Sequence, residues 1–193
     1  MKKKLLTFAV LLGVAALFSG CNYNTLVEEQ ENVEKAWSEV ENQYQRRSDL
    51  IPNIVNTVKG YAAHEQTTLT DVVEARANAS SVKIQAEDLT EENLARFQQA
   101  QDALSQGIGR LMAVAEAYPD LKANENFLEL QAQLEGTENR ITVARRNYNE
   151  TAQVYNAEIR KFPTIVYAGW FGFKKKPYFQ ASAGADRAPV VEF

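Results

Sequence analysis

Apolar side chains recur along most of the chain at alternating steps of three and four residues, the spacing of one face of a long α-helix. The longest run extends from Val33 to Tyr61 without a skipped turn, and Arg47 is its one charged member. Pro52 falls inside this run, removes one backbone donor and predicts a bend, yet the register continues past it. The pattern therefore predicts one bent helix over about residues 25–62.

Three further helical segments are predicted after short turns. The second covers residues 66–84, the third follows Thr90 as its N-cap and is closed by Pro119, and the fourth covers residues 124–161. Four such segments predict an all-α fold, an antiparallel up-down-up-down four-helix bundle. The first and fourth helices are long, so we expect them to extend beyond the middle pair at one end.

Polar side chains interrupt the apolar faces of these predicted helices. Five positions where the register calls for a hydrophobic residue carry Arg47, Arg76, Gln101, Glu138 and Arg145. Long polar side chains at the edge of a seam can reach water along their stems. Two alternatives are a buried, mutually paired cluster that fixes the helix register, with Arg47 paired to Glu138, and a pocket for an anionic ligand. The sequence leaves these interpretations open.

The start of the chain has a different composition from the helical segments. Three lysines at positions 2–4 precede an apolar run from Leu5 to Phe18 and then Ser19, Gly20 and Cys21, the only cysteine. This order is typical of a secretory signal, and the run is shorter than the roughly 20 residues that cross a membrane as a helix. Residues 18–21 resemble a bacterial lipoprotein processing box, in which the thiol receives a diacylglycerol and the chain is cut just before it.

We therefore expect residues 1–20 to be a cleaved signal and Cys21 to carry the lipid. The mature chain would be anchored to a membrane of the bacterial cell envelope and would face the non-cytoplasmic side. An uncleaved anchor, or an ordinary signal that precedes a free thiol, remains an alternative. The remaining segments are expected to be a linker over residues 21–24, the bundle over 25–162, an aromatic and basic segment over 163–180 and a loose tail over 181–193.

The aromatic and basic segment follows Pro163, where the helical pattern ends. It contains the residues Trp170, Phe171, Phe173, Lys174, Lys175 and Lys176. The aromatic rings either fold back over the seam that the short second helix leaves uncovered or face a bilayer, where Trp, Tyr and Phe are favoured. The two alternatives are compatible if the aromatic rings pack against the helices and only the lysines face lipid.

Charge and composition restrict the chemistry. The 193 residues carry a formal charge of −4, and loss of the three leader lysines changes it to −7, so nucleic acid is not expected as a partner. A single cysteine excludes an internal disulfide, and one histidine excludes a zinc site built from several Cys or His ligands. With the thiol of Cys21 expected to carry a lipid, no free cysteine is left for a Cys–His pair. His64, at a predicted turn, is expected to be a cap or surface residue. We expect no cofactor, no metal and no catalytic activity.

Several motifs resemble the LemA family. The stretch from Arg46 to Glu65 reads RRSDLIPNIVNTVKGYAAHE and is similar to the signature of that family. Further matches lie at Glu74–Ala77, Ala113–Ala123, Glu138–Ile141, Ala144–Arg145, Tyr148–Asn149, Tyr155–Asn156, Phe162–Pro163 and Phe171–Phe173. The resemblance implies a membrane-attached, all-helical antiparallel bundle without an established catalytic activity. Many members keep an amino-terminal transmembrane helix, in place of which this sequence has a lipoprotein-type leader.

The sequence favours a non-enzymatic, lipid-anchored helical bundle that acts as a scaffold or protein-binding module, with membrane lipid and an unidentified envelope protein as partners. An envelope enzyme that uses carboxylates in a groove of the bundle is one alternative, and a deep cleft with two facing acids would support it. A structural element of membrane organisation that works by self-association is another.

Overall fold

The computed structural model describes residues 23–180, and most of this part of the chain is helical. The elements are α2 (Tyr23–Tyr61), α3 (Gln66–Ser81), the 3-10 helix η1 (Ala86–Asp88), α4 (Glu91–Glu116), α5 (Pro119–Lys122), α6 (Glu125–Glu158) and α7 (Thr164–Tyr167). No β-strand occurs within residues 23–180. The described part of the chain is therefore all-helical, as the hydrophobic pattern predicts. The expected signal over residues 1–20, Cys21 and the tail over residues 181–193 lie outside the described residues.

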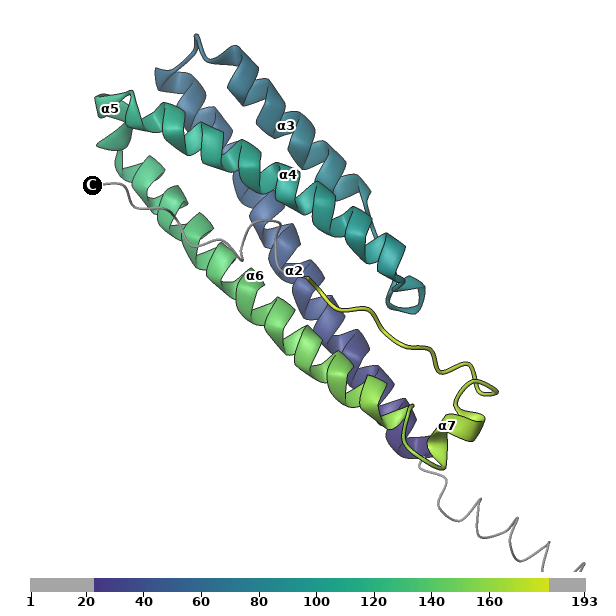
Figure 1. Cartoon of the computed structure of the whole chain (residues 1–193). Helices are drawn as coiled ribbons and strands as arrows, with labels where there is room; N and C mark the ends of the chain where they lie inside the picture. The colour runs from purple at the N-terminus through teal and green to yellow at the C-terminus, as the bar shows by residue number, and fades with distance from the viewer. Residues whose placement is uncertain (1–22, 181–193) are drawn as a thin grey trace, which may run out of the picture.

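Helices α2 and α6 are the long elements, with 39 and 34 residues. At about 1.5 Å per residue they are roughly 58 and 51 Å long. They lie side by side over most of their length, while α3 and α4 pair with each other beside the second half of α2 (Figure 1). The α2–α6 pair therefore extends beyond α3 and α4 at the end where α2 begins.

The helix boundaries follow the capping chemistry of the sequence. Thr90 caps α4, because its hydroxyl accepts a hydrogen bond from the backbone N–H of Asn93 at 3.1 Å. Asn124 caps α6 in the same way, with the N–H of Phe127 at 3.0 Å. Pro52 lies inside α2 without ending it, as predicted. The helix is already formed at Tyr23, so residues 23 and 24 belong to α2 and not to the expected linker.

The second helix is shorter than predicted, since α3 ends at Ser81 and not at residue 84. The extended backbone that follows brings the carbonyl oxygen of Ile84 to 3.1 Å from the indole N–H of Trp37. Burying this ring without a partner for its N–H would carry a desolvation cost. The indole hydrogen bond explains why the chain leaves the helix here.

Residues 173–180, which we call the strap, run back along the helices after α7 (Figure 1, yellow). Gly172 makes the reversal possible with a φ of +82°, a conformation that a residue with a Cβ rarely adopts. The rings of Phe173 and Phe179 are buried in the core. The alternative in which the aromatic segment folds back over the seam therefore holds for the strap.

Candidate functional site

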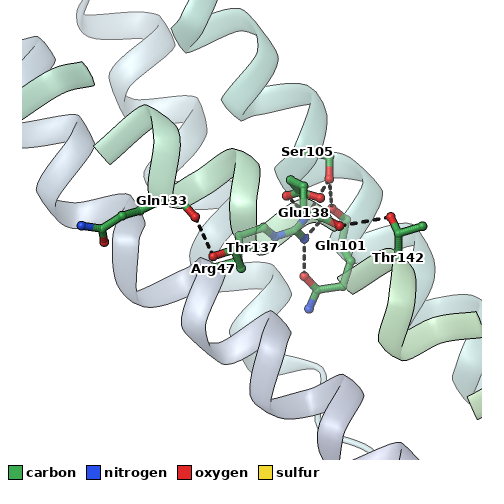
Figure 2. A network of polar contacts seen from close by, with 7 residues as sticks. All are labelled: Arg47, Gln101, Ser105, Gln133, Thr137, Glu138 and Thr142. Carbon is green, nitrogen blue, oxygen red and sulfur yellow. Dashed lines mark hydrogen bonds and ion pairs between the residues drawn. The ribbon is translucent and has the colours of Figure 1, made fainter. Parts of the chain in front are cut away.

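A polar layer crosses the interior of the molecule at Arg47 of α2, whose side chain is 1 % exposed (Figure 2). Its Nη1 donates hydrogen bonds to Ser105 Oγ at 2.7 Å and to Glu138 Oε1 at 2.9 Å. Its Nη2 donates to the carbonyl oxygen of Gln101 at 3.1 Å and to Gln101 Oε1 at 2.6 Å. The layer thus connects α2, α4 and α6 through one guanidinium group.

This polar layer divides the hydrophobic core into two clusters. One cluster is built around Trp37, and the other contains Ile51 and Leu104. Along α2, Arg47 stands between Tyr44 of the first cluster and Ile51 of the second. A shift of α2 by one turn would place the guanidinium among apolar side chains. Burying a charge there without hydrogen-bond partners would cost a large amount of free energy. The layer therefore fixes the relative register of the three helices.

The acceptors around Arg47 leave little capacity for a ligand. Four acceptors of the protein surround Nη1 and Nη2, and Nε alone has no partner. The ring of Tyr44 lies beneath the guanidinium, 5.0 Å from Cζ to the ring centroid. Burial raises the pKa of the Tyr44 hydroxyl. The positive charges of Arg145 and Arg47 lower this pKa, but their effect is smaller than that of burial. Among the three interpretations of the interrupted seam, the geometry fits a mutually paired cluster.

Two of the five predicted residues lie apart from this layer. Arg76 is half-buried on α3 and donates from Nε to the carbonyl oxygen of Ser48 at 2.8 Å. Arg145 donates to the carbonyl oxygen of Gln180 at 2.9 Å and lies over the ring of Phe179, 4.7 Å from Cζ to the centroid. The expectation that all five form one cluster is therefore wrong for these two: Arg76 bonds the backbone of α2 one residue after Arg47, and Arg145 contacts the strap.

Sequence reasoning missed Ser105 and Thr137 in the polar layer. Ser105 lies one turn after Gln101 on α4, so a search for small polar residues four positions from a seam residue would have found it. The Thr137 side chain is buried beside the layer and donates to the carbonyl oxygen of Gln133 at 2.8 Å (Figure 2). Thr137 stands three residues after Leu134 and four before Ile141, so it too interrupts the apolar spacing of α6, and that spacing was the signal for it.

Two asparagines of α6 hold the strap through its backbone. Asn156 accepts from the N–H of Lys176 and donates to its carbonyl oxygen, both at 2.8 Å. Asn149 makes the same pair of bonds with Phe179, at 2.9 and 3.0 Å. The two asparagines are seven residues apart and so share one face of α6. The repeated Tyr-Asn pair was the sequence signal for this site, and sequence reasoning did not use it.

The residues predicted to face a membrane or to pack fall into two groups. Trp170 is 81 % exposed, and Phe171, Lys174 and Lys175 are also exposed. Phe173 and Lys176 are buried, so the alternative in which the rings pack inward and the lysines face lipid does not hold for Lys176. Its ammonium group donates to the carbonyl oxygen of Ala86 at 2.8 Å, and burial lowers its pKa. Lys175 lies 3.4 Å from the carboxylate of Glu91.

Two shallow grooves flank the strap. One lies over α6 and has a volume of about 600 Å³, and the other lies over α4 with about 800 Å³. Tyr178 and Gln180 of the strap line both grooves. His64, the only histidine, is exposed in the turn after α2 and lines neither of them. None of the helices within residues 23–180 combines the length and apolar character that spanning a bilayer requires.

These features define an all-helical protein whose two long helices are tied by an internal polar layer and covered by a C-terminal strap. The model of the LemA family matches residues 36–193. The chain belongs to the LemA family.

Curated proteins of bacteria are similar over most of the chain. Magnetosome protein MamQ 2 of Paramagnetospirillum magneticum is 28% identical over 186 residues, which cover 88% of this chain and 68% of that protein. Magnetosome protein MamQ of Magnetospirillum gryphiswaldense is 25% identical with the same coverage. Protein LemA of Metamycoplasma hominis is 25% identical over 178 residues, which cover 92% of this chain and 78% of that protein.

Proposed function

We propose that this protein is a non-enzymatic scaffold of a bacterial cell envelope that is anchored to a membrane and binds another envelope protein. In this proposal α2, α3, α4 and α6 form an antiparallel up-down four-helix bundle, and the strap forms part of the binding surface. Membership of the LemA family supports a membrane-associated helical protein. The lipid anchor would be Cys21, two residues before the start of α2.

The observation that carries the scaffold role is the internal satisfaction of the polar layer. A catalytic or ligand-binding centre keeps charged groups available for a substrate. Arg47 instead donates to Ser105, Gln101 and Glu138, all of them groups of the protein itself. In such an arrangement the polar groups bind one another and fix the register of the helices. A rigid binding module requires a fixed register of this kind.

The grooves beside the strap do not favour the alternative of a carboxylate enzyme. Glu150 is the one acidic residue among the described residues that line the α6 groove. The α4 groove has Glu91 and Asp102, which are separated by about 16 Å along one helix at ~1.5 Å per residue. Paired carboxylates that hydrolyse glycosides lie roughly 5–9.5 Å apart. The grooves therefore support recognition better than acid–base catalysis.

Tyr178 gives the strap a side chain suited to a protein interface. It is partly exposed between the two grooves, while the strap backbone beneath it is held by Asn149 and Asn156. Tyrosine is enriched at protein interfaces because it offers a large, rigid contact surface with a polar end. A fixed backbone also reduces the entropy that would be lost on binding. We therefore assign the partner to this surface.

The proposal is tested by capture from native membranes. The tagged full chain is cross-linked with a cleavable amine-reactive reagent and purified, and the recovered proteins are identified. We expect one envelope protein in near-constant proportion to the bait, and a tag on that protein should recover this chain in return. Recovery of this chain alone would support the self-association alternative, and recovery of no protein would contradict the scaffold role.

A further inference from the structure

The end of the molecule at which α2 begins carries a concentration of exposed apolar side chains. α7 lies beside the start of α2 (Figure 1), and the ring centroids of Phe171 and Tyr23 are 5.2 Å apart. We call this surface the apolar end. It consists of Tyr23, Val27, Phe162, Ile165, Val166, Trp170 and Phe171, each of them exposed. Isolated apolar residues on a surface need no explanation, but a group of this size at one end indicates a contact.

We propose that the apolar end inserts into the interfacial layer of a phospholipid bilayer. This inference rests on the membrane attachment in the proposed function and adds a second, non-covalent contact to it. Cys21 precedes Tyr23 by two residues, and a chain advances at most about 3.6 Å per residue. An attachment point at Cys21 therefore lies within roughly 7 Å of the Tyr23 backbone. Tyr23, and the ring of Phe171 that packs against it, are then held next to the lipid surface.

The composition of this end matches a bilayer interface. Trp and Tyr have an apolar body and a polar tip, and they are enriched where acyl chains meet headgroups. Arg160 and Lys161 precede Phe162, and Lys174 and Lys175 follow the turn at Gly172. The sequence contains no acidic residue between Glu158 and Asp186. Arg160 and Lys174 thus border the apolar side chains as basic groups that suit anionic headgroups, whereas Lys161 pairs with Glu158 and Lys175 with Glu91. Two acidic residues, Glu28 and Glu29, follow Val27 on α2, so the apolar side chains carry the larger part of this argument.

Insertion of this end has a geometric consequence for the rest of the protein. α2 and α6 run side by side away from α7, and α3 and α4 lie beside the far half of α2 (Figure 1). A contact at the apolar end in addition to one attachment point holds the long axis of the α2–α6 pair upright on the membrane. The grooves beside the strap are then presented to the side, above the membrane surface.

The test uses the two tryptophans of the full chain. Trp170 is in the apolar end, whereas Trp37 is 1 % exposed in the core. The full chain is reconstituted into vesicles of phosphatidylcholine and phosphatidylglycerol, with and without bromine on the acyl chains, and flotation confirms that every sample is membrane-bound. Brominated acyl chains should quench most of the Trp170 emission, and aqueous iodide should not. The variant Trp170→Phe reports the Trp37 emission alone and should respond to neither quencher.

A matched control places tryptophan at the other end of the molecule. Leu128 of α6 is 48 % exposed, and Leu128→Trp is made in the Trp170→Phe background. Its emission should be quenched by iodide and not by brominated lipid. Quenching of native Trp170 by iodide and not by lipid would overturn the proposal. Protection of Trp170 from both quenchers would show a protein contact instead and would overturn it as well. Neither result would affect the capture of a protein partner through the strap.

Discussion

The guanidinium of Arg47 on α2 lies 2.9 Å from the carboxylate of Glu138 on α6, between two clusters of buried apolar side chains. The arginine side chain is 1 % exposed and the glutamate side chain 43 %. Because Glu138 keeps contact with water, its desolvation cost is smaller than that of a fully buried ion. The pair therefore provides specificity of register at a modest cost in stability.

Glu138→Gln should lower the free energy of unfolding by about 1–3 kcal/mol, because the buried arginine loses the carboxylate that pairs with it. Glu135→Gln on the same helix is exposed and should stay within about ±0.5 kcal/mol. Urea unfolding followed by circular dichroism measures both values. Equal effects of the two substitutions would contradict the role of Glu138.

A double-mutant cycle with Arg47→Met and Glu138→Gln isolates the pair from its neighbours. We expect a coupling free energy above about 0.5 kcal/mol, since the two side chains share a direct hydrogen bond. Ser105 and Gln101 remain in place throughout the cycle. A coupling of zero would mean that the other acceptors alone stabilise Arg47.

The asparagine contacts should control the strap. Asn156→Ala leaves the N–H and the carbonyl group of Lys176 without their partner, and two such buried groups cost about 2–6 kcal/mol. Hydrogen exchange at the strap amides should accelerate, while exchange in α3 should stay unchanged. Asn147→Ala is the control, because Asn147 is an exposed residue of the same helix. Unchanged strap exchange in Asn156→Ala would show that the apolar contacts of Phe173 and Phe179 are sufficient.

Alkaline pH should destabilise the protein through Tyr155. Burial, together with the carboxylate of Glu34, raises the pKa of Tyr155 to about 12, against about 10 for an unfolded tyrosine. Between these values the unfolded chain releases the proton and the folded chain keeps it, so stability falls as the pH rises. The contribution is complete below pH about 10. The free energy of unfolding of Tyr155→Phe should decline less steeply above that pH, and an identical slope would contradict this assignment.

Lipid attachment is tested at Cys21, which lies outside the described residues. Cys21→Ala should leave the precursor uncut or release the protein from membranes. Two or three long acyl chains anchor a protein stably, since each buried methylene contributes about 0.8 kcal/mol. Intact mass spectrometry of the membrane-derived wild type should show a diacylglycerol on residue 21. An unmodified thiol there would refute the lipoprotein hypothesis.

The periodicity of apolar residues predicted the helices well, because a buried helical face requires apolar residues at steps of three and four in the sequence. The continuity of α2 through Pro52 and the capping of α4 by Thr90 follow from local rules, and both predictions are confirmed. The early end of α3 was not predictable, since it depends on a hydrogen bond between Ile84 and Trp37, 47 residues away in the chain. Local propensity carries no information about such a contact.

The candidate site was only partly predictable for a related reason. Arg47 and Glu138 are visible as interruptions of an apolar register, and the structure places them in contact. Arg145 follows the same pattern but contacts the strap, whose path depends on tertiary packing. Lys176 belongs to a run of three lysines that reads as a solvated patch, and the extended backbone of the strap turns this one inward. Which side chains of a short irregular segment point inward depends on the helices it packs against, so the sequence of the segment alone does not show it.

The central claim is that the strap surface binds an envelope protein, and photo-crosslinking at Tyr178 tests it most directly. A benzophenone amino acid replaces Tyr178 in the full chain, and in a second variant it replaces Leu128, which lines neither groove beside the strap. After irradiation of native membranes, we expect one discrete adduct with a protein from position 178 and none from position 128. The adduct should weaken when Asn156→Ala loosens the strap. The absence of a protein adduct at position 178, or the same adduct from both positions, would contradict the account.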